Sequence, residues 1–165
     1  MALADAVRAV DRWPPHRVGT TEEFVVGSST LAALVAESDQ AVIGHVAIHE
    51  RSAEPVMAVA EDALRLEREQ LAVVARLFVD PHLRRAGVGG ALLAGAVDRV
   101  TANDRIAILD VWEELDDAID LYERNRWSRL GSVTFRFRAA CGPDCLHAGS
   151  TLRSFVYAAP DVVLA

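Results

Sequence analysis

The chain has 165 residues, of which 52% are hydrophobic and 25% are charged. This length and composition are typical of one compact globular domain and exclude a disordered or low-complexity chain. The formal net charge is −7, which disfavours nucleic acid and anionic membrane surfaces as partners, because phosphate groups are bound by clustered Lys and Arg. The same charge suits a cationic substrate such as an amine.

No stretch of the sequence approaches the run of about 18 apolar residues that a membrane-spanning helix needs. Charged residues interrupt the N-terminal segment, which therefore lacks the apolar stretch of a signal peptide. Cys141 and Cys145 are too few for a disulfide framework. We therefore predict a single cytoplasmic domain over residues 1–165, without membrane association.

The apolar pattern predicts alternating helices and strands in chain order. A helix over residues 2–12 ends at a Pro-Pro turn, and strands at 31–36 and 41–49 form a hairpin around a polar turn. There follow a long connection at 50–69 with a helical centre, a strand at 71–79, a helix from 83 to about 100, a strand at 106–111, a helix at 115–126, and strands at 130–138 and 152–158. No repeat or linker divides them, so the sequence predicts one α/β domain.

Two histidines share one face of the strand at 41–49. Side chains alternate along a strand, so His45 and His49 lie opposite Val46 and Ile48. We expect the histidine face not to be entirely core, with surface or boundary histidines as the alternative to a catalytic pair, since an unperturbed imidazole titrates near neutrality.

A basic, glycine-rich turn joins the strand at 71–79 to the helix that follows it. The first amides of a helix lack internal acceptors and lie at the positive end of its dipole, and glycine lets an anion approach the backbone closely. The segment therefore fits a diphosphate group, although an ordinary strand-to-helix turn can have the same residues. They are Arg84, Arg85, Ala86, Gly87, Val88, Gly89 and Gly90.

Two common nucleotide-binding motifs do not match this turn. A P-loop has Lys followed by Ser or Thr after its last glycine, where this chain has Ala91 and Leu92. A Rossmann fingerprint has a third glycine, which is absent at Leu92.

The turn resembles the acetyl-CoA site of the Gcn5-related N-acetyltransferase (GNAT) family. The family pattern Arg/Gln-x-x-Gly-x-Gly/Ala is met by Arg84, Gly87 and Gly89. A Leu-x-Val-x-Pro strand end precedes that pattern, as it does in the family, and comprises Leu77, Val79 and Pro81. The order of the elements also matches, so the resemblance extends over nearly the whole chain from about residue 31.

A second motif lies on the last predicted helix. Residues 121–127 resemble the family's Leu-Tyr-x-x-x-Gly-Phe segment, with Arg126 in place of the glycine and Trp127 as the aromatic residue. Leu115 stands where many relatives have an asparagine that binds pantetheine, and the family's first strand is not evident. The chain therefore has either a very short first strand or none.

The resemblance implies a GNAT-like α/β fold of the α+β type. Its central, mostly antiparallel twisted sheet would be flanked by helices and splayed at the cofactor slot, where the strands from Leu71 and Ile106 part. Acetyl-CoA would be the cosubstrate, with no metal. Backbone groups of Leu77 and Val79 would bind the pantetheine arm on a bulged strand, an amide near Phe78 would polarise the thioester carbonyl, and the amides from Arg85 to Gly90 would bind the pyrophosphate.

The resemblance also suggests the acid and the base of the reaction. Tyr122 is placed as the general acid to the leaving thiolate, with simple packing on the sheet as the alternative. Asp110, twelve residues before Tyr122, stands where N-terminal peptide acetyltransferases have a glutamate, and a carboxylate beside an apolar pocket can act as a base. A turn-forming aspartate is the alternative, and Glu113 or Glu114 could substitute for it.

Three other features leave alternatives open. Arg76, within an apolar strand, could bind an acceptor carboxylate or pair with an internal acid. The turn at residues 13–16 could form a wall of the acceptor site or could only end a helix. Cys141, Cys145 and His147 have no strong zinc-ligand spacing, so free thiols in a loop are expected.

Together these features predict an acetyl-CoA-dependent N-acetyltransferase that acts on a primary amine by direct attack in a ternary complex. A small-molecule amine is favoured as the acceptor because the connection at 50–69 would narrow the acceptor side of the site. The alternatives are a peptide or protein N-terminus or lysine, and a catalytically silent CoA-binding sensor. Members of the family that the chain resembles often pair through exposed last strands, which implies a homodimer, with shielding of that edge by charge as the alternative.

Overall fold

The computed structural model describes residues 3, 6–7, 10, 29–136 and 151–160. They form a six-stranded sheet of order β1-β2-β3-β4-β6-β5, in which only β3 and β4 are parallel. The predicted α/β class with a mostly antiparallel sheet is therefore confirmed. The elements are β1 (Thr30–Ser38), β2 (Ala41–His49), α3 (Glu54–Leu64), β3 (Leu71–Val79), α4 (Val88–Thr101), β4 (Ile106–Trp112), α5 (Asp116–Arg124), β5 (Ser128–Arg136) and β6 (Thr151–Ala158).

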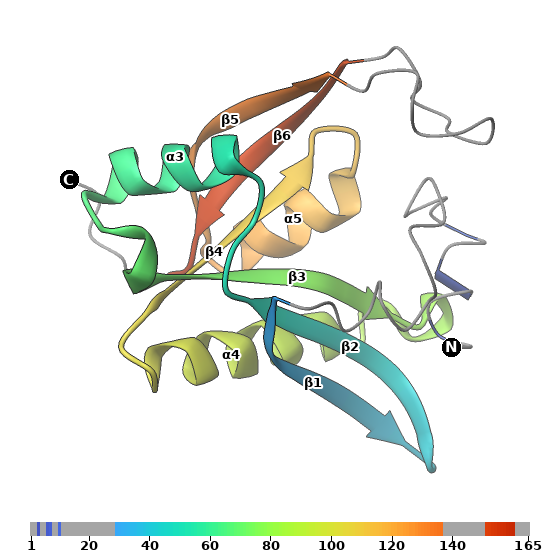
Figure 1. Cartoon of the computed structure of the whole chain (residues 1–165). Helices are drawn as coiled ribbons and strands as arrows, with labels where there is room; N and C mark the ends of the chain where they lie inside the picture. The colour runs from blue at the N-terminus through green and yellow to red at the C-terminus, as the bar shows by residue number, and fades with distance from the viewer. Residues whose placement is uncertain (1–2, 4–5, 8–9, 11–28, 137–150, 161–165) are drawn as a thin grey trace.

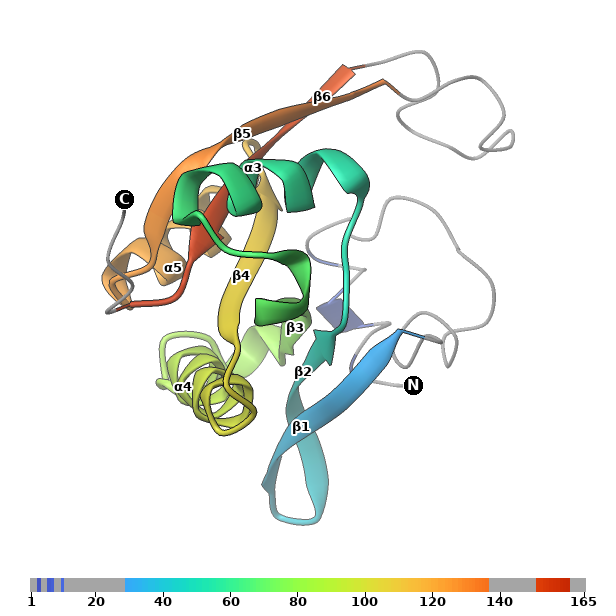
Figure 2. The ribbon, with the colours of Figure 1, turned by 60° about the vertical axis from the view of Figure 1, so that its left-hand side comes forward.

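Helices cover the two faces of this sheet, each with its own apolar core. Figures 1 and 2 show α3 and α4 on opposite sides of the sheet. One core, which includes Leu92, Leu93 and Tyr122, joins α4 and α5 to the sheet. The other core, which includes Met57 and Ile108, joins α3 to β3, β4, β5 and β6.

The predicted hairpin at the start of the described sheet is confirmed. Ser38 pairs with Ala41, so Asp39 and Gln40 alone form the turn, and both have positive φ angles of 49° and 66°. Two consecutive left-handed residues make a type I′ turn, whose twist matches that of the strands.

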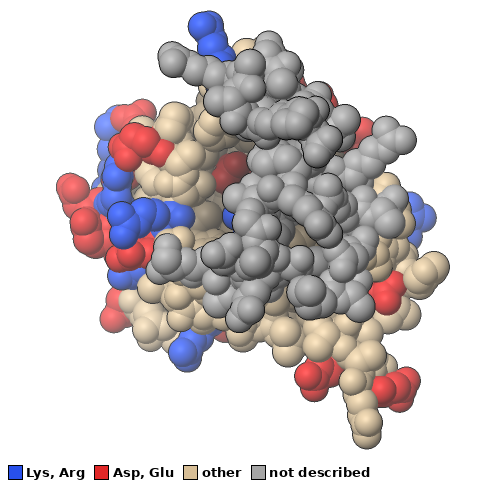
Figure 3. Space-filling model, turned by 45° about the vertical axis from the view of Figure 1, so that its right-hand side comes forward, with Lys and Arg blue, Asp and Glu red and all other residues tan. Residues whose placement is uncertain are grey.

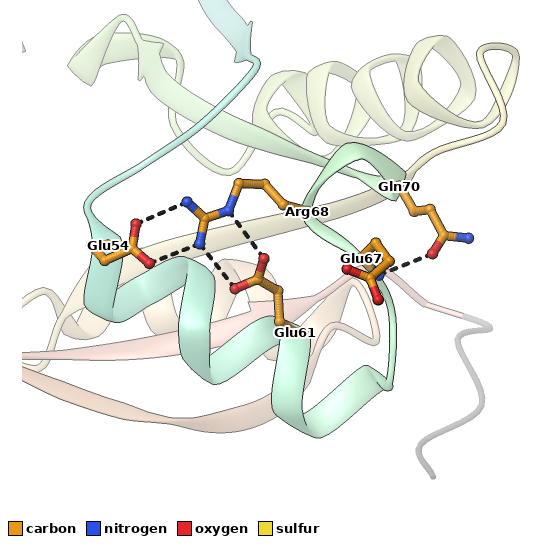
Figure 4. A network of polar contacts seen from close by, with 5 residues as sticks. All are labelled: Glu54, Glu61, Glu67, Arg68 and Gln70. Carbon is orange, nitrogen blue, oxygen red and sulfur yellow. Dashed lines mark hydrogen bonds and ion pairs between the residues drawn. The ribbon is translucent and has the colours of Figure 1, made fainter.

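The predicted helical centre of the connection between β2 and β3 is confirmed as α3, and an ion-pair network ties the end of this connection back to the helix. Arg68 donates hydrogen bonds of 2.8 and 2.9 Å to Glu54 and of 3.0 and 3.1 Å to Glu61 (Figure 4). Glu67 and Gln70 close a capping box around the short 3-10 helix that carries Arg68. The network therefore fixes how the connection crosses the sheet.

Helix α4 begins later than the sequence pattern predicts. It starts at Val88 rather than at residue 83, because Pro81–Leu83 form a separate 3-10 turn. Arg85 and Gly87 then adopt left-handed φ angles of 66° and 85°, which an α-helix cannot accommodate. The turn before the helix is thus a distinct loop that ends at a glycine N-cap.

The Leu-Tyr motif forms the C-terminal cap of α5. The amide of Trp127 donates to the carbonyl of Tyr122, and that of Arg126 donates to Glu123, both at 3.0 Å. This is the Schellman pattern, and Arg126 occupies its left-handed position with a φ of 64°. The rings of Tyr122 and Trp127 lie 6.1 Å apart, which supplies the apolar contact of that motif. The left-handed position of such a cap favours glycine, and in this chain Arg126 occupies it.

Several predicted features lie wholly or partly outside the described residues. Leu3, Ala6, Val7 and Val10 are helical, in agreement with the first predicted helix, but its other residues are not described. The turn at residues 13–16, any first strand, and the loop with Cys141, Cys145 and His147 are also outside the described part. No helix in the described ranges is long and apolar enough to span a membrane.

Candidate active site

A cleft of about 1390 Å³ passes from the N-terminus of α4, between β3 and β4, to the segment that follows β2. Its lining includes the glycine-rich turn, the second half of β3, the end of β4 and one face of α5. At the far end the lining consists of Ser29, His49, Arg51, Ser52 and Ala53. The cleft therefore connects the predicted cofactor residues to a separate polar end.

The cleft exists because β3 and β4 pair only at their beginnings. Their register runs from Leu71 with Ile106 to Val73 with Ile108, and then β3 continues along β2 while β4 continues along β6. Figure 1 shows the two halves of the sheet diverging beyond this point. The predicted splay at the cofactor slot is thus confirmed.

A β-bulge sits in the diverging part of β3. Arg76 and Leu77 lie between the pairs His45–Phe78 and Ala47–Ala75, and Arg76 has a left-handed φ of 55°. The Nδ1 atom of His45 donates a 2.9 Å hydrogen bond to the Arg76 carbonyl, and the His45 ring stacks on Phe78 at 5.9 Å. His45 therefore holds the bulge, which turns backbone groups of β3 away from regular pairing.

We call the glycine-rich turn before α4, residues 84–90, the amide cradle. Arg85 and Gly87 have left-handed φ angles and Arg84 is extended, while the Ala86 amide donates a 3.4 Å hydrogen bond to the Leu83 carbonyl. A Cβ atom at Gly87 would meet nothing within 4 Å, whereas one at Gly89 would lie 3.1 Å from Leu121. The turn is therefore open above Gly87 and closely packed on α5 at Gly89.

Asp110 lies on β4 in the wall of the cleft. Ser52 donates a 3.2 Å hydrogen bond to its Oδ1 atom. Burial raises the pKa of the Asp110 carboxyl, while the Ser52 hydrogen bond, the Arg76 charge and Ser154 oppose that rise. Arg76 lines the same cleft, and the Asp110 charge partly offsets the lowering of its own pKa by burial.

Tyr122 lies on the buried face of α5 and also lines the cleft. Burial raises the pKa of its phenol, and the negative charge of Asp110 raises it further. The hydroxyl therefore remains protonated near neutral pH. A protonated phenol and a carboxylate thus face one cleft close enough to interact electrostatically.

The histidine face of β2 is buried, contrary to the expectation of a partly exposed surface. His45 and His49 are each 7% exposed. Val7 and Ser52, which lies three residues after the end of β2, line the same cleft as His49. Periodicity assigns a residue to one face of a strand but does not show how deeply that face is buried.

The structure brings nearly all the predicted site residues together. Ala86 and Val88 belong to the turn but do not line the cleft. Those that do line it are Leu77, Phe78, Val79, Arg84, Arg85, Gly87, Gly89, Gly90, Asp110 and Tyr122. Sequence reasoning missed Ser52, because no local pattern marks a serine 58 positions from its partner.

Charged groups surround this cleft without forming a metal site. In the view of Figure 3, an acidic and a basic group lie recessed in a hollow of the molecular surface. Glu114 lines the cleft, whereas Glu113 contacts Arg153 at 3.9 Å. Within the described residues, no group of three His, Cys, Asp or Glu side chains is placed to hold a metal ion.

The family model of the acetyltransferase (GNAT) family matches residues 4–126 of the chain. This range includes the glycine-rich turn, the bulged strand, Asp110 and Tyr122. A comparison with curated protein sequences found no match.

Solved structures share the fold at low sequence identity. The chain is 19% identical to Arabidopsis thaliana NAA60 in complex with a bisubstrate analogue, with a TM-score of 0.65 over 94% of this chain and 90% of that one. For smu.2055 from Streptococcus mutans UA159 the identity is 16% and the TM-score 0.63, over 96% and 94% of the chains.

A third structure contains the cofactor. The chain is 14% identical to yncA from Salmonella typhimurium with its cofactor acetyl-CoA, with a TM-score of 0.55 over 81% of this chain and 66% of that one. The chain thus spans just under two thirds of yncA, and 65% and 66% of two further N-acetyltransferases that it matches.

Proposed function

Because this chain belongs to the acetyltransferase (GNAT) family, we propose that it transfers an acetyl group from acetyl-CoA to a primary amine, by direct attack within a ternary complex. The observation that carries this proposal is the continuous cleft, which joins the amide cradle at Gly87 to Asp110 and Tyr122. A binding cradle at one end and a paired acid and base further along are what this transfer requires.

The amide cradle fits the pyrophosphate of coenzyme A. The first amides of α4 have no acceptor within the helix and lie at the positive end of its dipole. Arg84 and Arg85 add positive charge beside them, and the open space above Gly87 admits a phosphate group. The backbone of the bulged strand at Leu77 and Val79 would hold the pantetheine arm, and an amide near Phe78 would polarise the thioester carbonyl.

The bound coenzyme supplies the acetyl group as a thioester. Asp110, directly or through a water chain, takes a proton from the acceptor ammonium so that the amine can act as a nucleophile. Its raised pKa improves it as a base, and the hydrogen bond from Ser52 orients it. Tyr122, which is protonated at neutral pH, donates its hydroxyl proton to the departing sulfur.

We propose a small-molecule amine as the acceptor. Residues 51–53 lead into α3 and line the polar end of the cleft, so the connection between β2 and β3 narrows the acceptor side. The peptide alternative is supported by the likeness to a ribosomal-protein-alanine N-acetyltransferase from Brucella melitensis, whose name gives a protein as its acceptor. A catalytically silent CoA-binding module is supported by Leu115, which lines the cleft near α5. This apolar residue stands where many relatives have an asparagine that binds pantetheine.

One pair of measurements tests the proposal and separates these alternatives. Isothermal titration calorimetry with coenzyme A measures binding, and a thiol assay measures release of free coenzyme A from acetyl-CoA with a panel of amines and peptides. Binding together with amine-dependent release supports the enzyme. Tight binding without release for any acceptor supports the silent module, and the absence of binding contradicts both.

A further inference from the structure

His49 lines the cleft, and within the described part of the chain one of its ring nitrogens is buried without a hydrogen-bond partner. The Nδ1 atom lies 3.2 Å from the Thr30 hydroxyl and 3.3 Å from the Ser29 hydroxyl. The Nε2 atom has no hydrogen-bond partner within the described residues, although the side chain is 93% buried and lines the cleft. Buried polar atoms are almost always paired in folded proteins. The arrangement therefore points to a partner that enters the cleft.

The surroundings keep this imidazole neutral and able to accept a proton. Burial lowers the pKa of His49, the charges of Arg76 and His45 lower it further, and a hydrogen bond to the Ser29 backbone opposes this lowering. Asp110, on β4, is the acidic group that faces Arg76 in the same cleft. A neutral imidazole that donates its Nδ1 proton has its lone pair on Nε2, the atom left without a partner.

The proposed reaction releases one net proton for each acetyl group transferred. An ammonium group R–NH3+ and the thioester become R–NH–CO–CH3, CoA–SH and H+, as a C–N bond forms and the C–S bond breaks. Tyr122 gives one proton to sulfur and regains one from the nitrogen, so its state is unchanged. The proton taken up by Asp110 must therefore leave before the next turnover.

We propose that His49 is a further acid–base residue of this reaction, a role that rests on the proposed function. Its Nε2 atom accepts the proton that the acceptor ammonium loses. This proton reaches His49 from Asp110 or from a water molecule bound to Asp110. Its Nδ1 atom then releases a proton toward the hydroxyls of Ser29 and Thr30 and on to bulk water. Proton exchange with water then restores the tautomer that has its proton on Nδ1. In these steps only N–H and O–H bonds form and break.

Chemical rescue tests this role. In weakly buffered solution we expect His49→Ala to lower kcat at least about 10-fold, with little change in the affinity for coenzyme A. Added imidazole should restore kcat several-fold, because a small buffer can occupy the space and carry the proton. His49→Gln keeps a polar group but cannot titrate, so it should be slow and unresponsive to imidazole. His82→Ala, which removes an exposed imidazole outside the cleft lining, is the matched control.

A second variant keeps the test valid if His49→Ala does not fold. Ser29→Ala combined with Thr30→Val removes the hydroxyls beside Nδ1 and leaves the His49 ring and Asp110 in place, and it should lower kcat without raising KM. An unchanged kcat in both variants, or a loss that imidazole never restores, overturns the role of His49 alone. A wild-type protein that releases no coenzyme A with any amine overturns the proposed function, and this inference with it.

Discussion

The Ser52 hydroxyl donates a 3.2 Å hydrogen bond to Oδ1 of Asp110, 58 positions further along the chain. Ser52 lies just before α3, on the connection that leaves β2, whereas Asp110 lies on the strand that diverges from β3. The bond therefore ties the two sides of the cleft at its polar end. It also acts on the carboxyl that we propose as the base, because a hydrogen bond to the charged form lowers its pKa.

Ser52→Ala should shift the pH dependence of turnover to higher pH. Asp110 accepts a proton only when it is ionised, so kcat/KM rises as pH increases through its pKa. Loss of the Ser52 hydrogen bond removes an effect that lowers this pKa, so the rise should occur at higher pH while the rate at alkaline pH changes little. A pH profile of CoA release measures the shift.

Asp110→Asn is the companion variant for this profile. It keeps an oxygen that can accept from Ser52 but removes the titrating group, so it should lower the rate about 100-fold or more and abolish the dependence assigned to Asp110. A profile that is the same in Ser52→Ala and in the wild type would assign the base to another group.

Tyr122→Phe should lower turnover about 10-fold or more, because the leaving thiolate would lose its proton donor. Tyr157→Phe is the matched control, since that hydroxyl bonds Glu123 and Arg129 instead of lining the cleft. The control should lose some stability and keep its turnover rate. Equal rates in Tyr122→Phe and the wild type would leave Tyr122 with a packing role only.

Gly87→Ala should weaken the binding of coenzyme A about 10-fold. Its φ of 85° is left-handed, and a side chain in that region costs about 1–2 kcal/mol, so the amide cradle would relax or the fold would lose stability. Gly95→Ala, on the same helix but away from the cleft, meets Leu34 at 3.3 Å and should bind normally. Calorimetry on both variants measures the difference. Undiminished affinity in Gly87→Ala would place the phosphates elsewhere.

Arg126→Gly should stabilise the fold by up to about 1 kcal/mol, because glycine adopts the left-handed position of the α5 cap without strain. Arg124→Gly places the same change within the helix and should lower stability by about 0.5–1 kcal/mol. Denaturant unfolding compares the two variants. If both were destabilised alike, the conformation at Arg126 would not be the source of strain.

The sequence alone determined the chain order of the elements and the position of the glycine-rich turn after β3, because both depend on local patterns. Strand β3 was predicted with its bounds of Leu71–Val79, since a run of apolar residues is bounded by Asp80 and Pro81. The start of α4 was predicted too early, because apolar spacing cannot show that Arg85 adopts a left-handed conformation. Binding of coenzyme A by the amide cradle at the end of β3 stays a prediction.

Only the tertiary structure decided which side chains share the cleft. The contact of Ser52 with Asp110 joins segments that no periodicity relates, whereas Thr30 and His49 are partners in the predicted hairpin. The burial of the histidine face depends on what packs against it, which the alternation of side chains along one strand does not show. Short-range sterics and hydrophobic spacing are encoded in neighbouring residues, whereas burial, pKa and the orientation of a polar atom depend on what packs against it.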